Sequence, residues 1–336
     1  MDTRLDTTVL VLLATGDASG DRNAAVLTTA RGLGTVHAVS LTGDSLTGDS
    51  LTGDGDLTGE GEAGLGRYGA AVVHRAELDS AAPAAVVAHA LAGLAREIDA
   101  AAVLVPSEPA AAEVAALTAH ALDAGLVLDV LDLEVGAQGR LATRRRAFGG
   151  TWDVDVEVTR PRAVVTVARA AGPAVPLPDH GAAEVRPYVV GPGPELHGRR
   201  VVQRTEAPAP GRPRLADADV VVVGGRGTEG AFEPLRELAA QLGGVIGSTG
   251  VAVVEGWADA ETLVGQTGTT IAPRLYIGAG VSGAEHHRAG MSAAGTVVAV
   301  NSDPDAPIFE LARFGVVGDL FAVLPQLTAE LRRARS

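Results

Sequence analysis

Three glycines follow a short apolar run in the segment LYIGAGVSGAEHH, residues 275–287, with the spacing Gly278-x-Gly280-x-x-Gly283. This spacing is typical of a strand that turns into a helix whose N-terminus faces a pyrophosphate. Glycine permits the tight turn and a close approach of ligand oxygens, and the unpaired N–H groups of the helix favour negative charge. The segment therefore predicts a pyrophosphate site.

The residues beyond this turn add support. Residues 296–300 form a second strand-like apolar run, which ends at Asn301 and Asp303. That is about the separation at which a dinucleotide fold presents a polar group to ribose hydroxyls. Since the chain contains 43 glycines, the glycine spacing alone is a weak signal. The polar pair makes a dinucleotide the favoured ligand.

Several other polar residues lie at or just after strand-like runs in the second half of the chain: Arg226, Thr267, Ser282, His286, His287, Asn301 and Asp319. Ligands of open α/β sheets bind at the carboxyl ends of the strands. Hydrolytic and phosphate-loop motifs are missing from the sequence, and the adjacent histidines lack metal-ligand spacing to a carboxylate pair. Thr267 and Asn301 also suit simple cap or turn roles.

Composition sets the fold class. The chain has 336 residues, of which 46% are hydrophobic and only 3% aromatic, so its cores must be built from Ala, Val and Leu. Such cores suit buried parallel strands that alternate with helices, and the length suggests about two domains. We therefore predict an α/β protein of two domains, each with a mainly parallel sheet flanked by helices.

Charge and cysteine content exclude several functions. A net charge of −14 disfavours nucleic acid and anionic membrane surfaces as partners. With no cysteine, the chain cannot supply disulfides, thiolate nucleophiles or cysteine-ligated metals, so redox chemistry would need a bound organic cofactor. No apolar run is long enough for a membrane span or a signal peptide, and we expect a cytoplasmic protein.

Residues 1–206 read as the first domain. Strands are predicted at 8–14, 35–40, 101–105 and 126–130, and helices at 23–33, 81–96 and 110–124. Three shorter, partly antiparallel strands, 140–146, 153–158 and 163–167, are expected to close the domain. The repeat LTGDS within residues 41–62 carries six acids and no base, which indicates a solvated insertion. The arginines at 144–146 suit a solvated edge strand better than an anion site.

The segment APAPGRP, residues 207–213, reads as a linker, and residues 214–336 as a second, doubly wound domain. Parallel strands are predicted at 219–223, 245–246, 274–277, 296–300 and 314–317, with a helix at 232–242. The first of these strands ends in Gly-Gly-Arg-Gly, a second turn compatible with phosphate binding.

Two long runs of this second domain, VGQTGTTIAPRLYIGAGVSGAEHHRAGM and TVVAVNSDPDAPIFELARFGVVGDLF, resemble the C-terminal FAD domain of the electron-transfer flavoprotein alpha subunit family. The preceding run, RPRLADADVVVVGGRG, is similar to the family's entry into this domain. Fainter similarity extends through the first half, where LVLDVLDLE and TRRRAFGGTWDVDVEV resemble the family's N-terminal domain. The resemblance implies an FAD-binding subunit that pairs with a beta subunit. It would pass single electrons from donor dehydrogenases to a respiratory or other acceptor oxidoreductase, with no substrate turnover of its own.

The resemblance also implies a set of cofactor-binding residues: Arg226, Thr249, Gln266, Thr267, Gly268, Gly280, Ser282, Gly283, His286, His287, Asn301, Asp303, Asp319 and Leu320. Gln266 and Thr267 would contact the isoalloxazine ring, with Thr267 at N5, and His287 would lie near the flavin O2 edge. Ser282 and the neighbouring glycine amides would hold the pyrophosphate. The polar pair at 301 and 303 would reach the ribose and phosphate, and residues 319 and 320 the adenine.

The chain departs from the family pattern beside the flavin. Gly250 stands where the family has an arginine that packs by the ring, and losing a fixed cation should lower the flavin potential. His286 replaces a family glutamine, and Arg288 follows where leucine is usual. We hypothesise that His286 or Arg288 supplies the missing charge.

Two alternative functions stay open at this point. One is an oxidoreductase that uses NAD at the same glycine turn, although the short helix before Gly290 disfavours it. The other is an interaction subunit that has lost flavin chemistry, which Gly250 makes conceivable.

Overall fold

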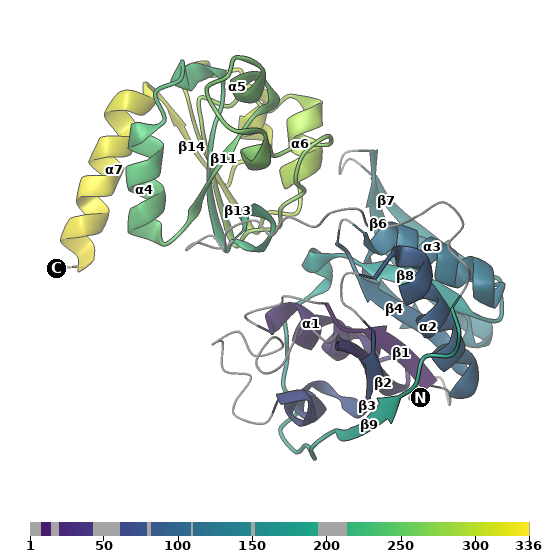
Figure 1. The fold of residues 1–336 in the computed structure, drawn as a ribbon. Helices are drawn as coiled ribbons and strands as arrows, with labels where there is room; N and C mark the ends of the chain where they lie inside the picture. The colour runs from purple at the N-terminus through teal and green to yellow at the C-terminus, as the bar shows by residue number, and fades with distance from the viewer. Residues whose placement is uncertain are drawn as a thin grey trace. The chain divides into compact units, whose positions relative to one another are not determined.

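The structure is a computed structural model that describes residues 8–14, 20–42, 61–78, 82–108, 110–148, 152–193 and 214–335. Residues 43–60, most of the predicted acidic insertion at 41–62, and the linker at 207–213 lie outside the described residues. The chain divides into two compact units, one built on a nine-stranded sheet and one on a five-stranded sheet (Figure 1). Both sheets are mainly parallel and flanked by helices, so the predicted α/β class is confirmed. The domain boundary at 206 stays a prediction.

The first unit contains strands β1 (Thr8–Leu12), β2 (Thr35–Thr42), β3 (Ala70–Glu77), β4 (Ala100–Pro106), β5 (Gly125–Val135), β6 (Leu141–Ala147), β7 (Trp152–Glu157), β8 (Ala163–Val167) and β9 (Glu184–Tyr188). Its α-helices are α1 (Asp21–Ala30), α2 (Ala84–Glu97) and α3 (Ala111–Leu122). The strand order is β7-β6-β5-β8-β4-β1-β2-β3-β9, and β5 and β6 are antiparallel.

The order of these strands corrects two sequence predictions and adds two strands that were not expected. β8 was expected among the closing, partly antiparallel strands, but it lies between β4 and β5 and is parallel to both. All of its residues are buried, because helices or loops cover both faces of a central parallel strand. β6, expected at an edge, lies between β5 and β7. β3 and β9 were not predicted at all.

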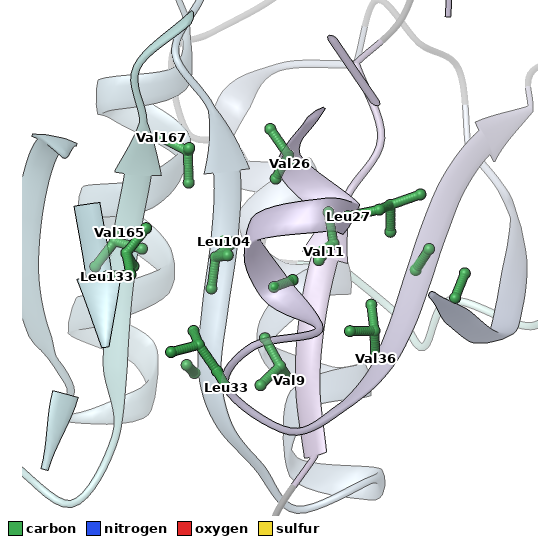
Figure 2. Close-up of a cluster of buried hydrophobic side chains, with 14 of the residues drawn as sticks. Val9, Val11, Val26, Leu27, Leu33, Val36, Leu104, Leu133, Val165 and Val167 are labelled. Carbon is green, nitrogen blue, oxygen red and sulfur yellow. The ribbon is translucent and has the colours of Figure 1, made fainter. Parts of the chain in front are cut away.

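Alternation along β1 builds two cores, one on each face of this sheet. Val9 and Val11 pack on the face that α1 covers, with Leu27 from that helix (Figure 2). Leu10 and Leu12 point to the other face, where α2 and α3 pack. A strand buried on both faces reads as a continuous apolar run, and the sequence of β1 is such a run.

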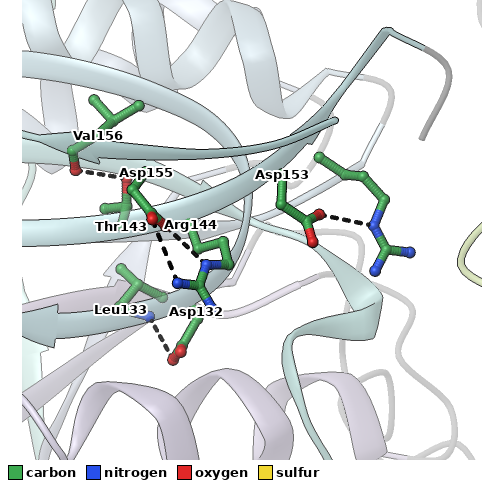
Figure 3. A network of polar contacts seen from close by, with 8 residues as sticks. Asp132, Leu133, Thr143, Arg144, Asp153, Asp155 and Val156 are labelled. Atoms are coloured by element: carbon green, nitrogen blue, oxygen red, sulfur yellow. Dashed lines mark hydrogen bonds and ion pairs between the residues drawn. The ribbon is translucent and has the colours of Figure 1, made fainter. Parts of the chain in front are cut away.

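Ion pairs, rather than a free cationic surface, occupy the arginine-rich hairpin. The Nε atom of Arg144 lies 2.7 Å from Oδ1 of Asp155, and Nε of Arg146 lies 3.2 Å from Oδ1 of Asp153 (Figure 3). All four side chains are exposed, so each pair adds little stability. The pairing leaves these two guanidinium groups poorly suited to bind an anion.

The second unit contains strands β10 (Val220–Gly224), β11 (Val245–Ser248), β12 (Leu275–Ala279), β13 (Thr296–Asn301) and β14 (Phe314–Val317), with helices α4 (Glu233–Leu242), α5 (Gly250–Val254), α6 (Glu285–Met291) and α7 (Leu320–Arg335). The order is β11-β10-β12-β13-β14, and every pair is parallel. All five strands therefore end at one edge. The chain reverses direction across the sheet between β10 and β12, which is the switch point where such sheets bind ligands.

The helices of the second unit cover both faces of the sheet. Side chains of α4 and α7 share one core with β10, β12 and β13, and α6 contributes Met291 to the core of the opposite face. Across the described part of the chain, no helix combines the length and apolar character needed to cross a membrane.

Candidate cofactor site

The loops that follow β10 and β12 are in direct backbone contact at the switch point. The N–H of Gly225 donates to the carbonyl of Ala279 at 3.1 Å, and that of Gly227 to the carbonyl of Gly280 at 3.0 Å. A Cβ atom at Gly225 would lie 2.3 Å from the Gly280 oxygen. Gly225 and Gly227 are thus required for the packing of one strand-end loop on the other.

The turn after β12 presents backbone donors beside this loop contact. Gly280 has φ 64° and Gly283 has φ 81°, which is the left-handed region that favours glycine. Among the described residues, the N–H groups of Val281, Ser282 and Gly283 find no acceptor. The Ser282 side chain is exposed. Successive free N–H groups and a hydroxyl are suitable donors for phosphate oxygens.

Two side chains at the ends of neighbouring strands also have no protein partner. Arg226, just after β10, is exposed and forms no ion pair with any carboxylate in the described residues. Thr249, just after β11, is 9% exposed, and its buried Oγ1 atom has no hydrogen-bond partner in the described structure. A buried hydroxyl without a partner costs about 1–3 kcal/mol, and native proteins rarely leave one. The unpartnered hydroxyl is therefore evidence that a ligand binds beside Thr249.

The loop at 264–268 carries the predicted ring contacts. Gln266, Thr267 and Gly268 are all exposed, so they are available to a ligand. The N–H of Gln266 donates to the His286 carbonyl at 2.8 Å, and Nδ1 of His286 lies 2.8 Å from Oε1 of Gln266. Helix α6 therefore holds this loop through residues that the sequence places about 20 positions away.

His287, in contrast, is buried and bonded to protein on both ring nitrogens. Nδ1 lies 2.9 Å from the Val264 carbonyl, and Nε2 lies 2.7 Å from the Tyr276 hydroxyl. Since a carbonyl only accepts, Nδ1 carries the proton and Nε2 accepts from Tyr276. Burial lowers the pKa of His287 to about 4, and it raises that of Tyr276. The imidazole is neutral, and its prediction as a flavin O2 contact stays a prediction.

Tyr276 and Val264 are residues that sequence reasoning missed. A tyrosine inside the apolar run of β12 was the available signal, because a buried phenol needs a hydrogen-bond partner. The carbonyl of Val264 gives no signal in the sequence.

The remaining predicted residues lie at the same edge and bond mainly to the protein. Nδ2 of Asn301 donates to the Val281 carbonyl at 2.8 Å, and Oδ1 of Asn301 accepts from the N–H of Asp303 at 3.0 Å. Oδ1 of Asp319 accepts from the N–H of Phe321 at 2.9 Å, at the start of α7. Asn301 thus joins the ends of β12 and β13, as a turn residue would.

Leu320 follows as the first residue of α7 and is buried, 5% exposed. It packs against the turn at Gly280, where an added Cβ would lie 2.9 Å from its Cδ2 atom. Leu320 therefore contacts the glycine turn itself.

Gly250 begins α5 with open space around it. An added Cβ would meet only Cδ1 of Leu263, at 3.9 Å, so the backbone packing at this position does not require glycine. Arg288, one candidate for the replacement charge, lies 3.1 Å from Glu310. Its charge is already balanced, which leaves His286 as the better placed candidate.

Comparison with known proteins agrees with this geometry. Residues 22–190 match the family model of the electron transfer flavoprotein domain, and residues 214–292 that of the electron transfer flavoprotein FAD-binding domain. The electron transfer flavoprotein subunit alpha of Mycobacterium leprae is 41% identical over 269 residues, 79% of this chain and 82% of that protein. That of Mycobacterium tuberculosis is 37% identical over 276 residues, 80% and 84% of the two chains. Protein FixB of Bradyrhizobium diazoefficiens is 38% identical over 226 residues, 66% and 60%.

The switch-point residues Arg226, Thr249 and 280–283 lie inside the segment that the FAD-binding model matches. FAD is therefore the cofactor of the second unit. Helix α6, at seven residues, is shorter than the helix of an NAD-binding βαβ unit. The chain belongs to the electron transfer flavoprotein alpha subunit family.

Proposed function

We propose that this chain pairs with a beta subunit and passes single electrons from donor dehydrogenases to an acceptor oxidoreductase, without turning over a substrate itself. The observation that carries the proposal is the buried, unpartnered hydroxyl of Thr249 at the switch point. Together with an unpaired Arg226 and free N–H groups, it forms a donor set that fits an anionic dinucleotide.

The proposed binding residues follow the order of the strand ends. Thr249 donates its hydroxyl proton to the cofactor, and Arg226 supplies positive charge along it. Ser282, with the N–H groups of 281–283, holds the pyrophosphate. When bound, the isoalloxazine ring of FAD supplies the group that accepts and releases electrons.

The loop at 266–268 and its neighbours make up the rest of the proposed set. Gln266, Thr267 and Gly268 form the face toward the ring, with His286 beside Gln266. His287 belongs to the set through the loop that it holds. The edge of β13 and β14, with Asn301, Asp303, Asp319 and Leu320, faces the ribose and adenine.

The chemistry of this edge supports a carrier rather than an enzyme. Catalysis by a nucleophile requires a base within hydrogen-bonding reach. In the described part of this edge, His287 bonds to Val264 and Tyr276, and His286 bonds to Gln266. Neither imidazole in the described part of this edge is paired with a serine or threonine hydroxyl, which supports a role in binding and orientation over nucleophilic catalysis.

Stepwise reduction of the purified full chain, co-expressed with a beta-type subunit, tests the proposal. We expect yellow protein that takes up electrons one at a time and passes them to an acceptor, and that oxidises no small substrate alone. Colourless protein that binds NAD would instead indicate a dehydrogenase. Colourless protein that binds neither nucleotide would indicate an interaction subunit.

A further inference from the structure

The loop between β10 and α4, residues 225–232, is a compact turn that carries Arg226. The N–H of Glu229 donates to the Arg226 carbonyl at 3.1 Å, and the Thr228 hydroxyl donates to the Gly225 carbonyl at 2.8 Å. Thr228 is fully buried, whereas Arg226 is exposed. The turn therefore fixes the backbone at Arg226 and presents the guanidinium to solvent.

Each end of this loop rests on a different segment of the second unit. Near its start, the N–H of Gly227 donates to the Gly280 carbonyl at 3.0 Å, in the turn after β12. Near its end, Gly230 lies against the indole of Trp257, just after α5. A Cβ atom added at Gly230 would lie 3.2 Å from Cδ1 and 3.3 Å from Cγ of Trp257. The loop is therefore held by a backbone bond at one end and by an aromatic ring at the other.

Trp257 is itself fixed by the core of the second unit. Its side chain is partly buried and packs against the cluster that contains Phe232, Leu235 and Ala252. Its backbone N–H donates to the Ala252 carbonyl at 2.9 Å. An indole is large and has only two rotatable side-chain bonds, so ordering it costs little conformational entropy. The packed ring is therefore a rigid support for the loop.

We propose that Trp257 is a positioning residue for FAD, which supports the loop at 225–232 and so sets where Arg226 lies. A loop that is already ordered in the free chain does not have to be ordered when an anion binds, and the affinity rises accordingly. In this role Trp257 acts on FAD only through Arg226. The inference rests on the proposed function, in which Arg226 supplies positive charge along the cofactor.

Four substitutions test this role. Trp257→Ala removes the ring from Gly230, whereas Trp257→Phe keeps an aromatic ring against it. Arg226→Gln removes the charge that the loop carries. Leu331→Ala is the matched control, because Leu331 is partly buried against the same core. It lies about 16 Å along α7 from Leu320, far from the strand ends, so its loss lowers stability without touching the loop.

Amide hydrogen exchange of the full chain without added FAD reports the loop directly. We expect Trp257→Ala to accelerate exchange of residues 227–232 by about tenfold or more, because the loop opens locally once its support is gone. Trp257→Phe and Leu331→Ala should stay within about threefold of the wild-type chain in this segment. Unchanged exchange in Trp257→Ala would overturn the inference. Equal acceleration in Leu331→Ala would overturn it too, because a general loss of stability would then explain both.

A double-mutant cycle on FAD affinity tests the link to Arg226. Trp257→Ala and Arg226→Gln should each weaken FAD binding about tenfold. In the Trp257→Ala chain, Arg226→Gln should cost less than about threefold, because a guanidinium that is no longer held in place already contributes little. Trp257→Phe should bind FAD within about threefold of the wild-type chain. Additive losses in the double variant would overturn the inference, since Trp257 would then act independently of Arg226.

Two further outcomes are decided by the same measurements. If Trp257→Ala fails to fold, Trp257→Leu, which keeps apolar bulk without a flat ring, replaces it in both experiments with the same expectations. A wild-type chain that binds FAD but shows additive losses rejects this inference and leaves the proposed function intact. Should the wild-type chain bind no FAD, the proposed function fails, whereas the exchange measurement still decides whether Trp257 holds the loop.

Discussion

The Nδ1 atom of His286 lies 2.8 Å from the amide oxygen of Gln266, on the loop that we assign to the flavin ring. Two residues later, the guanidinium of Arg288 is paired with Glu310 at 3.1 Å. A paired cation has most of its field cancelled by its partner, whereas the imidazole is directed at the loop. The hypothesis that one of these residues replaces the family arginine therefore favours His286.

Replacement of His286 should change the flavin, and replacement of Arg288 should not. His286→Gln keeps a hydrogen-bond donor for Gln266 but removes the capacity for positive charge, so we expect the flavin midpoint potential to fall by roughly 20 mV. Arg288→Leu, the matched control, should leave it unchanged. Potentiometric titration of the purified proteins gives both values. If neither potential moves, no residue of this pair compensates for Gly250.

Restoring the cation at position 250 should raise the potential. A Cβ atom added at Gly250 would meet only Cδ1 of Leu263, at 3.9 Å, so position 250 accepts the first carbon of the side chain in Gly250→Arg. A fixed positive charge beside the ring stabilises the reduced, more negative flavin, by an amount on the order of 1 kcal/mol or roughly 40 mV per electron. The same potentiometric titration measures this shift. A potential that stays constant or falls would show that this position does not face the flavin.

The contact between the two strand-end loops should tolerate no side chain at Gly225. A Cβ there would lie 2.3 Å from the Gly280 oxygen, and such overpacking costs about 1–3 kcal/mol. We expect Gly225→Ala to lower the unfolding temperature and to weaken FAD binding. Gly250→Ala, in open space at the start of α5, is the matched control and should lose no stability. Equal unfolding temperatures in a thermal scan would contradict the packing described here.

Acid should destabilise the second unit through His287. The pKa of this buried imidazole is lowered from 6.5 to about 4, so the unfolded chain binds the proton more readily than the folded chain. Stability is fully present above pH 6.5 and is lost as the pH falls from 6.5 towards 4, by about 2 kcal/mol at pH 5. Urea unfolding at pH 7.5 and pH 5 measures the loss.

His287→Asn, which cannot titrate, is the control for this pH dependence. Between pH 7.5 and pH 5, this variant should lose about 2 kcal/mol less stability than the wild-type chain. The comparison also removes the contribution of His74 in the first unit, whose pKa is lowered in the same direction by burial. Identical pH dependence in both proteins would mean that the imidazole is not held neutral.

Much of the second unit could be predicted from the sequence because its strands are short apolar runs that end in glycine or a polar residue. The runs of β10 and β13 place Arg226 and Asn301 at the same edge, as parallel strands must. In the first unit, β9 reads EVRPY, and its charges and proline hide a strand that is mostly exposed. Such an edge strand is defined by its neighbour β3, not by its own pattern.

The roles of single side chains were harder to predict. His286 and His287 are adjacent in the sequence, yet a helix turns about 100° per residue, so one is exposed and the other buried. Which of them faces the core depends on where the sheet lies. The sequence predicted that the glycines allow a ligand phosphate to approach. Gly225 also allows close packing against protein backbone, which the sequence did not predict. Contacts between distant segments decide these roles.

Thr249 offers a test that needs no cofactor. Its buried hydroxyl has no partner, so Thr249→Val removes an unsatisfied polar group while keeping the shape of the side chain. We expect the stability of the FAD-free chain to stay the same or to rise by up to about 1 kcal/mol. Chemical denaturation of the FAD-free protein measures it. A clear loss of stability would show that the hydroxyl already has a protein partner.

The FAD affinity of this same variant tests the central claim most directly. If the Thr249 hydroxyl is a ligand donor at the switch point, Thr249→Val should bind FAD about tenfold more weakly than the wild-type chain. Thr328→Val, whose hydroxyl bonds to the Leu324 carbonyl on α7, should bind FAD normally. Equal dissociation constants for the wild-type chain and Thr249→Val would contradict the assignment of this switch point as the flavin site.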